Sequence, residues 1–401
     1  AKGIIKLEGS KSISNRVQII RALTVEDFTI DNLSISDDSN NLATLVSQSG
    51  NTYDTGHAGT CYRFMTGFLS IQDGEQILTG SERMKERPIG PLVDALRSLG
   101  AQIDYMENEG YPPLKIHSPD ADSYRHGHSN QVTISAGTSS QYISALLMIA
   151  PTLPNGLELI LDGEIVSRPY IEMTLNLMAY FGVQHEWNEQ TIIVKPQQYQ
   201  AKLYTVEADW SAASYYYSLA AIANQAQIQL NGLQEESVQG DAVLVDVMKD
   251  FGVKTTFNKQ GVLLEKVPCE INEFKYDCSD CPDLAQTLAV MCAALNVNAL
   301  LTGLETLTIK ETDRINAVKV ELEKLGCVVE ATENSLWIKK GISNKNQSIK
   351  VSTYEDHRMA MAFAPLALIL DQVTMEDKKV VCKSYPKFWE DFKTLGLGDY
   401  E

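Results

Sequence analysis

The sequence has no run of apolar residues long enough to cross a membrane. Its longest apolar segment, residues 359–370, falls short of the ~20 residues that a transmembrane helix needs, and it contains Pro365. Residues 1–6 also lack the apolar core of a signal peptide. We therefore expect a cytoplasmic protein without a membrane partner.

The chain is also poor in positive charge. It carries 34 Lys and Arg residues against 52 Asp and Glu residues, and the formal net charge of −18 repels nucleic acid. We therefore expect no nucleic-acid partner.

We further expect the chain to be a monomer.

Cysteine is scarce and scattered. Seven cysteines in 401 residues are an odd number, which is not typical of a disulfide framework. Cys278 and Cys281 form a single CxxC pair, for which zinc-binding and redox roles are the alternatives. No second pair accompanies it, so we interpret it as incidental and expect no metal site.

The overall composition of the chain is that of a globular protein, with 44% hydrophobic and 21% charged residues. A length of 401 residues predicts two or three domains, because domains usually contain ~100–200 residues.

A short phrase, usually Leu or Phe followed by Gly, recurs six times, and each copy closes an amphipathic segment. Each copy predicts a surface helix that ends at a C′ glycine, because glycine takes the left-handed conformation without strain. The six glycines are Gly50, Gly100, Gly182, Gly252, Gly326 and Gly396.

A second kind of helix precedes each of these surface helices. Residues 142–150 are an example, and they are apolar nearly all round, as a helix enclosed by other elements must be. Short β-branched runs at residues 190–194 and 335–339 predict strands between the helices. The six buried helices are expected to begin near Ser12, Gly59, Ser139, Asp209, Pro282 and Asp356.

The repeating unit is therefore an α+β unit with one buried and one surface helix. Six units predict an α/β protein of two domains with three units each, divided near residues 231–234. A solenoid is the alternative architecture. We favour closed bundles, because helices that are apolar all round need shielding from every side.

Several buried helices carry cations in or just before their first turn. Arg16, Arg63 and Arg358 lie in first turns, and Lys11 precedes one. Each polar helix start could be a plain N-cap. Cations at the positive end of a helix dipole cost stability, however, and bound phosphate or carboxylate would offset that cost.

Seven motifs in this order resemble those of the 5-enolpyruvylshikimate-3-phosphate synthases, the enolpyruvyl transferases of the shikimate pathway. The resemblance covers nearly the whole chain. The motifs are residues 9–16 (GSKSISNR), 58–60 with Arg63, 85–92 (KERPIGPL), 139–141 (SSQ), 167–170 (SRPY), 310–314 (KETDR) and 356–360 (DHRMA).

The resemblance implies a fold of six βαβαββ units arranged as a two-domain inverse α/β barrel, with three units per domain. It also implies that the first residues cross over to the second domain. The expected domains are residues 12–231, and residues 1–11 together with residues 232–401.

The resemblance further implies an activity. The family transfers the enolpyruvyl group of phosphoenolpyruvate to the 5-hydroxyl of shikimate 3-phosphate and releases phosphate through a tetrahedral intermediate. It implies these two small-molecule substrates and neither a metal nor an organic cofactor. Both substrates carry a phosphate and a carboxylate, which Arg and Lys side chains are suited to bind.

By similarity, most of the motif residues are expected to contact one substrate or both. The residues expected to bind shikimate 3-phosphate are Lys11, Ser12, Arg16, Ser139, Ser140, Gln141, Ser167, Tyr170, Asp283 and Lys310. The residues expected to bind phosphoenolpyruvate are Lys11, Gly59, Arg87, Gln141, Arg314, Arg358 and Lys383.

The expected catalytic residues are Asp283, Glu311 and Lys11. Asp283 resembles the family's proton acceptor and Glu311 its proton donor, while a plain N-cap is the alternative role of Asp283. His357 is either a helix-start residue or a further catalytic group. The chain departs from the family pattern at His57, at Phe64 and in the short segment 49–56.

Two other functions fit the fold. A related enzyme transfers enolpyruvyl to UDP-N-acetylglucosamine, but it opens with a Lys-Asn phrase, whereas Ser12 follows Lys11 here. A non-catalytic homologue would have lost the acids and bases, and these are present in this chain.

Overall fold

The chain folds into two compact units. The structure is a computed structural model that describes residues 1–117 and 130–397. Unit 1 contains Ala1–Ser10, Ile35–Asp37 and Glu207–Glu401, and unit 2 contains Lys11–Ser34 and Asp38–Val206. Residues 207–231, which we expected in the amino-terminal half, thus belong to unit 1.

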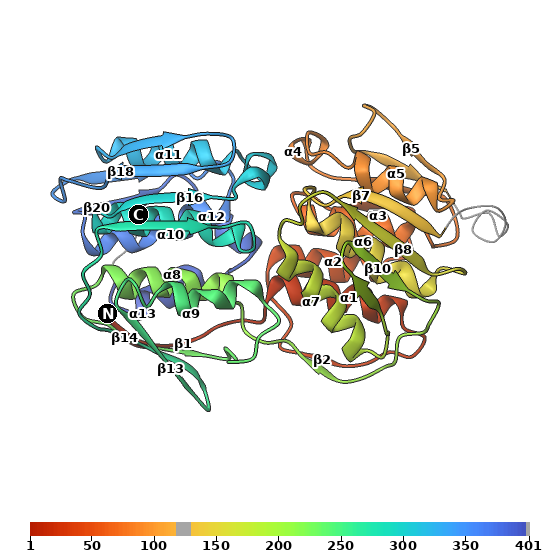
Figure 1. The fold of residues 1–401 in the computed structure, drawn as a ribbon, viewed down its shortest axis with the longest axis horizontal. Coiled ribbons are helices and arrows are strands. Elements are labelled where there is room, and N and C mark those ends of the chain that lie inside the picture. Colours follow the sequence, from red (N-terminus) through yellow and green to blue (C-terminus); the bar gives the residue numbers. More distant parts are fainter. Residues whose placement is uncertain (118–129, 398–401) are drawn as a thin grey trace. The chain divides into compact units, whose positions relative to one another are not determined.

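Unit 2 contains three long buried helices with strands packed around them (Figure 1). Its helices are α1 (Lys11–Leu23), α2 (Asp37–Ser47, whose first residue belongs to unit 1), α3 (Gly59–Leu69), α4 (Glu82–Lys85), α5 (Gly90–Ser98), α6 (Ser140–Ile149), η1 (Ala150–Thr152) and α7 (Arg168–Tyr180). Its strands are β2 (Ile30–Asp31), β3 (Thr52–Asp54), β4 (Gln76–Thr79), β5 (Ile103–Tyr105), β6 (Leu114–Ile116), β7 (Gln131–Ser135), β8 (Leu157–Asp162), β9 (Glu186–Asn188), β10 (Thr191–Val194) and β11 (Tyr204–Thr205).

Unit 1 is built in the same way, and Figure 1 shows α8, α10 and α12 in its middle. Its helices are α8 (Trp210–Ile222), η2 (Gly240–Val243), α9 (Leu244–Val247), η3 (Pro282–Leu284), α10 (Ala285–Leu295), η4 (Glu305–Ile309), α11 (Arg314–Lys324), α12 (His357–Phe363), η5 (Ala364–Leu368), η6 (Lys378–Lys383) and α13 (Phe388–Thr394). Its strands are β1 (Lys2–Lys6), β12 (Gln227–Asn231), β13 (Val253–Asn258), β14 (Gly261–Lys266), β15 (Glu273–Asp277), β16 (Asn298–Thr302), β17 (Val328–Ala331), β18 (Leu336–Lys340), β19 (Ser348–Val351) and β20 (Gln372–Met375).

The sheets repeat one pattern of strand order. Within the described residues, four sheets have four strands each, and in each of them one parallel pair is followed by two antiparallel pairs. Their orders are β1-β12-β14-β13, β3-β4-β6-β5, β7-β8-β10-β9 and β15-β16-β18-β17. The pairs β2-β11 and β19-β20 are parallel two-stranded sheets. The amino terminus belongs to unit 1 because β1 pairs with β12, with Lys2 opposite Gln227.

The helices begin and end largely where the sequence predicts. The buried helices α1, α3, α6, α8, α10 and α12 start within three residues of the expected positions. Gly100, Gly182, Gly252, Gly326 and Gly396 have left-handed φ angles between 68° and 110°. Gly50 was wrongly assigned as a C′ glycine, because α2 ends at Ser47 and Gly50 does not take a left-handed φ.

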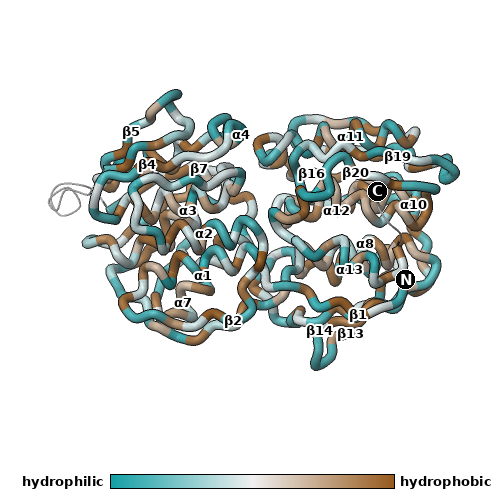
Figure 2. The backbone as a smooth tube through the Cα atoms, turned by 180° about the vertical axis from the view of Figure 1, so that it is seen from behind, coloured by the Kyte–Doolittle hydropathy of each residue, from teal (hydrophilic) through white to brown (hydrophobic). Residues whose placement is uncertain are grey.

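The buried helices form the core of each unit. Every residue of α10 from Ala285 to Ala294 is buried, and Trp210 at the start of α8 is 0% exposed. Figure 2 shows hydrophobic stretches along such inner helices and a hydrophilic tip on the β13–β14 hairpin. In the part of the chain that the structure describes, no helix combines the length and apolar character that a membrane crossing requires.

Candidate active site

Lys11 stands at the amino terminus of α1, where the helix dipole disfavours a cation. Its Nζ lies 3.1 Å from Oδ2 of Asp38 in the first turn of α2. Both side chains are largely buried. The ion pair with Asp38 thus offsets the unfavourable position of Lys11 and holds its ammonium group in place.

Arg16 lies on the same helix, and among the described residues it forms no ion pair. Its Nε donates to Oγ1 of Thr174 at 2.7 Å, and Nη2 donates to Oγ of Ser144 at 3.1 Å. Nη1 donates to the carbonyl of Ser12 at 2.9 Å. Burial lowers the pKa of Arg16 to about 10. The guanidinium is therefore a buried positive charge that neutral oxygens orient and that no carboxylate of the described residues neutralises.

Arg87 packs against the first residue of α3. A Cβ atom added to Gly59 would lie 2.6 Å from Nη1 of Arg87, so only glycine lets the guanidinium approach the helix this closely. Arg63 donates to the carbonyls of Gly59 at 3.1 Å and of Pro88 at 3.2 Å. Arg63 therefore joins α3 to the segment that carries Arg87.

The first turn of α6 contacts the first turn of α3. Nε2 of Gln141 donates to Oγ1 of Thr60 at 3.0 Å, and Oγ of Ser139, the N-cap, accepts from the backbone of Gln141 at 3.4 Å. Ser140 follows and is buried. Together with the Arg16 contacts, these bonds gather the amino-terminal turns of α1, α3 and α6 within unit 2. Converging helix amino termini form an anion-binding environment.

Ser167 is the N-cap of α7 and has a left-handed φ of 55°. Such a conformation costs a non-glycine residue ~1–3 kcal/mol and is concentrated at functional sites. The side chain of Ser167 makes no capping hydrogen bond. Tyr170, in the first turn of α7, accepts a hydrogen bond on its carbonyl from Nη2 of Arg16 at 3.4 Å.

Arg314 is the centre of the polar cluster in unit 1. It donates to Oδ2 of Asp356 at 2.6 Å, to Oδ1 of Asp283 at 3.1 Å and to Oε2 of Glu311 at 2.9 Å. Burial by itself lowers the pKa of Arg314, but the charges of these carboxylates outweigh it and hold the pKa above its ordinary value. Arg314 is therefore charged and fixed in place.

Asp283 bridges two arginines. Its Oδ1 faces Arg314, and its Oδ2 accepts from Nη2 of Arg358 at 2.7 Å. Asp283 lies inside η3, and the N-caps of η3 and α10 are Cys281 and Leu284. The alternative role of Asp283 as a plain N-cap is therefore wrong.

Glu311 lies between two cations. Its Oε2 contacts Arg314, and its Oε1 lies 3.6 Å from Nζ of Lys383, which is 9% exposed at the end of η6. Lys310 precedes Glu311 and is partly buried. His357 is buried at the start of α12, with Nδ1 3.6 Å from Oδ1 of Asp356.

Two departures from the family pattern have structural roles in unit 2. Phe64 is 1% exposed, and the guanidinium carbon of Arg16 lies 5.3 Å from the centroid of its ring. His57 is exposed, and its Nδ1 lies 3.1 Å from Oγ of Ser81. The segment 49–56 contains β3, which pairs with β4.

Sequence reasoning missed three buried acids, Asp38, Asp241 and Asp356. Asp356 caps α12 by accepting from the backbone of Arg358 at 2.8 Å, and it also binds Arg314. It stands in a recognised motif, so its residue type was a usable signal. Asp38 and Asp241 lie outside every motif, and only their burial distinguishes them.

Comparisons with known proteins identify the fold first. The solved structure of EPSP synthase from Acinetobacter baumannii matches with a TM-score of 0.76 at 20% identity and covers 99% of this chain and 96% of that chain. The protein thus has the mixed α/β fold of that structure.

Sequence comparisons then identify the family. The profile of EPSP synthase (3-phosphoshikimate 1-carboxyvinyltransferase) matches residues 44–392. A 3-phosphoshikimate 1-carboxyvinyltransferase of Bacteroides fragilis is 47% identical over 99% of this chain and 96% of its own length. One of Sulfurovum sp. is 37% identical over 98% and 96%. The chain belongs to the EPSP synthase family.

Proposed function

We propose that the protein is a transferase that moves the enolpyruvyl group of phosphoenolpyruvate to the 5-hydroxyl of shikimate 3-phosphate and releases phosphate, in the shikimate pathway of aromatic amino acid biosynthesis. The full-length relatives with the name 3-phosphoshikimate 1-carboxyvinyltransferase support this activity. They do not favour UDP-N-acetylglucosamine as the acceptor.

The observation that carries the proposal is the position of Asp283 between Arg314 and Arg358. A base must accept the hydroxyl proton beside groups that hold an anionic reactant, and guanidinium groups are suited to bind phosphate or carboxylate. Distances of 3.1 Å and 2.7 Å orient the carboxylate before substrate arrives.

Each substrate has its own set of proposed ligands, and the two sets share Lys11 and Gln141. Shikimate 3-phosphate binds Lys11, Ser12, Arg16, Ser139, Ser140, Gln141, Ser167, Tyr170, Asp283 and Lys310 in this proposal. Phosphoenolpyruvate binds Lys11, Gly59, Arg87, Gln141, Arg314, Arg358 and Lys383. Supporting observations are the gathered helix amino termini of unit 2 and the close packing of Arg87 on Gly59.

In the first chemical step, the 5-oxygen forms a bond to C2 of phosphoenolpyruvate while Asp283 accepts the hydroxyl proton. Glu311 delivers a proton to the methylene carbon, C3, which completes the tetrahedral intermediate. In the second step, the ionised Glu311 accepts a proton from C3 while the C2–O bond to phosphate breaks, which restores the double bond and releases phosphate. Lys11 stabilises negative charge on the reacting oxygens.

To act as the acid, Glu311 must hold a proton, although two cations lie beside it. In the free protein, Arg314 at 2.9 Å and Lys383 at 3.6 Å favour its ionised form. Bound phosphoenolpyruvate would bring negative charge to the same two cations and weaken their hold on Glu311. Glu311 then binds a proton more readily in the substrate complex, where the acid is needed.

The proposal extends to the architecture. We propose that each of the six sheets belongs to one βαβαββ unit, and that each domain is an inverse α/β barrel of three units. We place the domain boundary at the limit of the compact units, between Val206 and Glu207. We also propose a cytoplasmic monomer that requires no cofactor.

Phosphate release from phosphoenolpyruvate tests the proposed function. The purified protein is assayed with shikimate 3-phosphate, with UDP-N-acetylglucosamine and with no acceptor. We expect release with shikimate 3-phosphate alone. Release with the nucleotide sugar would assign the other transferase activity, and no release with either acceptor would indicate a non-catalytic homologue.

A further inference from the structure

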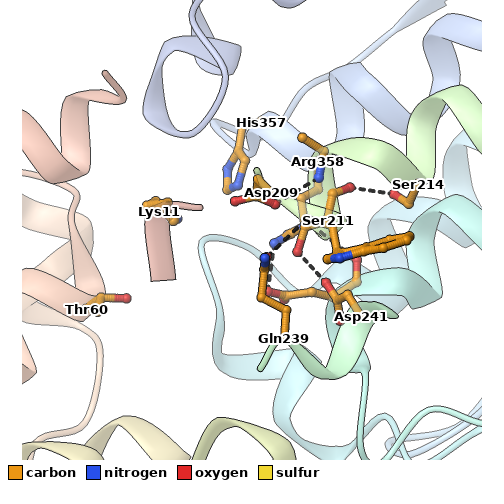
Figure 3. Close-up of polar contacts among 12 residues, drawn as sticks. Lys11, Thr60, Asp209, Ser211, Ser214, Gln239, Asp241, His357 and Arg358 are labelled. Atoms are coloured by element: carbon orange, nitrogen blue, oxygen red, sulfur yellow. Dashed lines mark hydrogen bonds and ion pairs between the residues drawn. The ribbon is translucent and has the colours of Figure 1, made fainter. Parts of the chain in front are cut away.

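Asp241 is a buried carboxylate that the proposed mechanism does not use. It lies in η2 and is 3% exposed. Ser211 donates a hydrogen bond to its Oδ2, as Figure 3 shows, whereas Oδ1 has no hydrogen-bond donor among the described residues. Burying an acceptor without a donor costs free energy. Retaining an acid here therefore calls for a reason other than stability.

Helix α8 connects Asp241 to the proposed base. Ser211 and Tyr215 lie one turn apart on the same face of this helix. Ser211 contacts Asp241, and the hydroxyl of Tyr215 accepts from Nη1 of Arg358 at 3.3 Å. Arg358 in turn holds Asp283 at 2.7 Å. Asp241 and Asp283 thus lie along one face of α8, and Figure 3 shows Asp241 beside Ser211.

We propose that Asp241 is a positioning residue that acts on Asp283 through its charge, so that Asp283 accepts the hydroxyl proton more readily when Asp241 is ionised. The inference rests on the proposed function. Arg314 and Arg358 favour the ionised form of Asp283 and so weaken it as a base. A second negative charge opposes the two arginines and restores basicity, because like charges disfavour each other.

Asp241 gains and loses its charge near neutral pH. Burial, followed by the negative charge of Asp283, raises the pKa of Asp241 to about 7. The interaction is mutual, so ionised Asp241 acts equally on Asp283.

The other charged or titratable groups that face Asp241 do not account for a change of charge near pH 7. The charges of Asp209, before α8, and Arg358, on α12, also act on Asp241. Cys278 and Cys281 face it from the turn before η3. Burial raises the pKa of both thiols, so they stay uncharged near neutral pH.

The first test is the pH dependence of kcat in Asp241→Asn, which keeps the shape of the side chain. We expect wild-type kcat to rise through about pH 7 as Asp241 ionises, and the variant to lack this rise and turn over about three- to tenfold more slowly at about pH 8. KM for shikimate 3-phosphate should change by less than about twofold, because the proposed ligands remain. A variant with the wild-type profile would overturn the inference.

Glu207→Gln is the matched control. Glu207 is also a buried acid of unit 1, with 6% exposure, and the charge that acts on it is that of Asp209 rather than Asp283. The control should keep the rise through pH 7. If it loses the rise as Asp241→Asn does, the effect belongs to any buried acid and the inference fails.

The second test does not require activity. The free energies of unfolding of wild type, Asp241→Asn, Asp283→Asn and the double variant at about pH 8 form a double-mutant cycle. We expect non-additive effects, because either substitution alone removes the repulsion between the two carboxylates. Additive effects would overturn the coupling. The proposed function fails separately, when wild type releases no phosphate with shikimate 3-phosphate.

Discussion

Oδ2 of Asp283 accepts a hydrogen bond from Arg358 at 2.7 Å, and the other oxygen of Asp283 faces Arg314. A carboxylate held at both oxygens cannot rotate to meet a substrate. In the proposed mechanism, the substrate must therefore arrive with its hydroxyl already aligned, and the proposed binding residues provide that alignment. Substitution of Asp283 should therefore slow the chemical step much more than it weakens substrate binding.

Asp283→Asn should lower kcat by about 10²–10⁴-fold, the usual range for a positioned proton-transfer group, with a much smaller effect on binding of shikimate 3-phosphate. Steady-state kinetics and calorimetric binding measure the two effects. Asp280→Asn, at an exposed residue of the same turn, is the control and should behave like wild type. Near-normal turnover in Asp283→Asn would rule out its role as the base.

Gly59→Ala should displace the guanidinium of Arg87, because the new methyl group would lie 2.6 Å from Nη1. Loss of charge-assisted hydrogen bonds, about 1.5–3 kcal/mol, predicts a KM for phosphoenolpyruvate that is about 10- to 100-fold higher. Glyphosate serves as a longer anionic probe of the proposed phosphoenolpyruvate site, and we expect it to lose more affinity than phosphoenolpyruvate.

Gly50→Ala is the control for this change, since only Nε2 of Gln48 lies near its added Cβ, at 3.8 Å. It should leave both ligands unaffected. Equal losses of glyphosate and phosphoenolpyruvate affinity in Gly59→Ala would argue against this position of Gly59 in the substrate site.

Arg16→Met should weaken binding of shikimate 3-phosphate without lowering the stability of the protein. The substitution removes a buried charge that has no carboxylate partner among the described residues, and Ser144, Thr174 and the carbonyl of Tyr170 keep hydrogen bonds with one another. The free energy of unfolding should therefore stay within about 1 kcal/mol of wild type or rise. Binding of shikimate 3-phosphate should weaken by about 10- to 100-fold, because a charge-assisted contact is lost.

Urea denaturation and calorimetry measure these two quantities. Arg21→Met on the same helix is the control, because Arg21 pairs loosely with Asp27 at 3.8 Å. It should preserve substrate affinity. Retained affinity in Arg16→Met would remove Arg16 from the proposed binding residues.

Glu207 should make stability depend on pH. Burial raises its pKa above the ordinary value of 4.5. The folded state therefore favours the neutral acid, and this contribution is complete below pH 4.5 and is lost as pH rises through the raised pKa. Glu207→Gln removes the dependence, so its stability relative to wild type should increase from about pH 5 to about pH 8. A constant difference across this range would contradict the prediction.

The sequence by itself determined where most helices begin and end. Asp209 caps α8 through the backbone of Ala212 at 2.9 Å, and Gly182 closes α7 with a φ of 90°. Both features are local, because a cap or a C′ glycine acts within four residues of the helix end. The motif residues were recognisable for a similar reason, since their order along the chain carries the family resemblance.

Only the tertiary structure decided which charges meet and which are buried. Arg16 finds Ser144 and Thr174 more than 100 residues away, and Lys11 finds Asp38 on another helix. Asp241 has an ordinary acidic residue type, yet burial beside the charge of Asp283 raises its pKa to about 7. Desolvation and charge interactions depend on distances in space that local sequence does not encode, so these properties appeared only when the helices packed together.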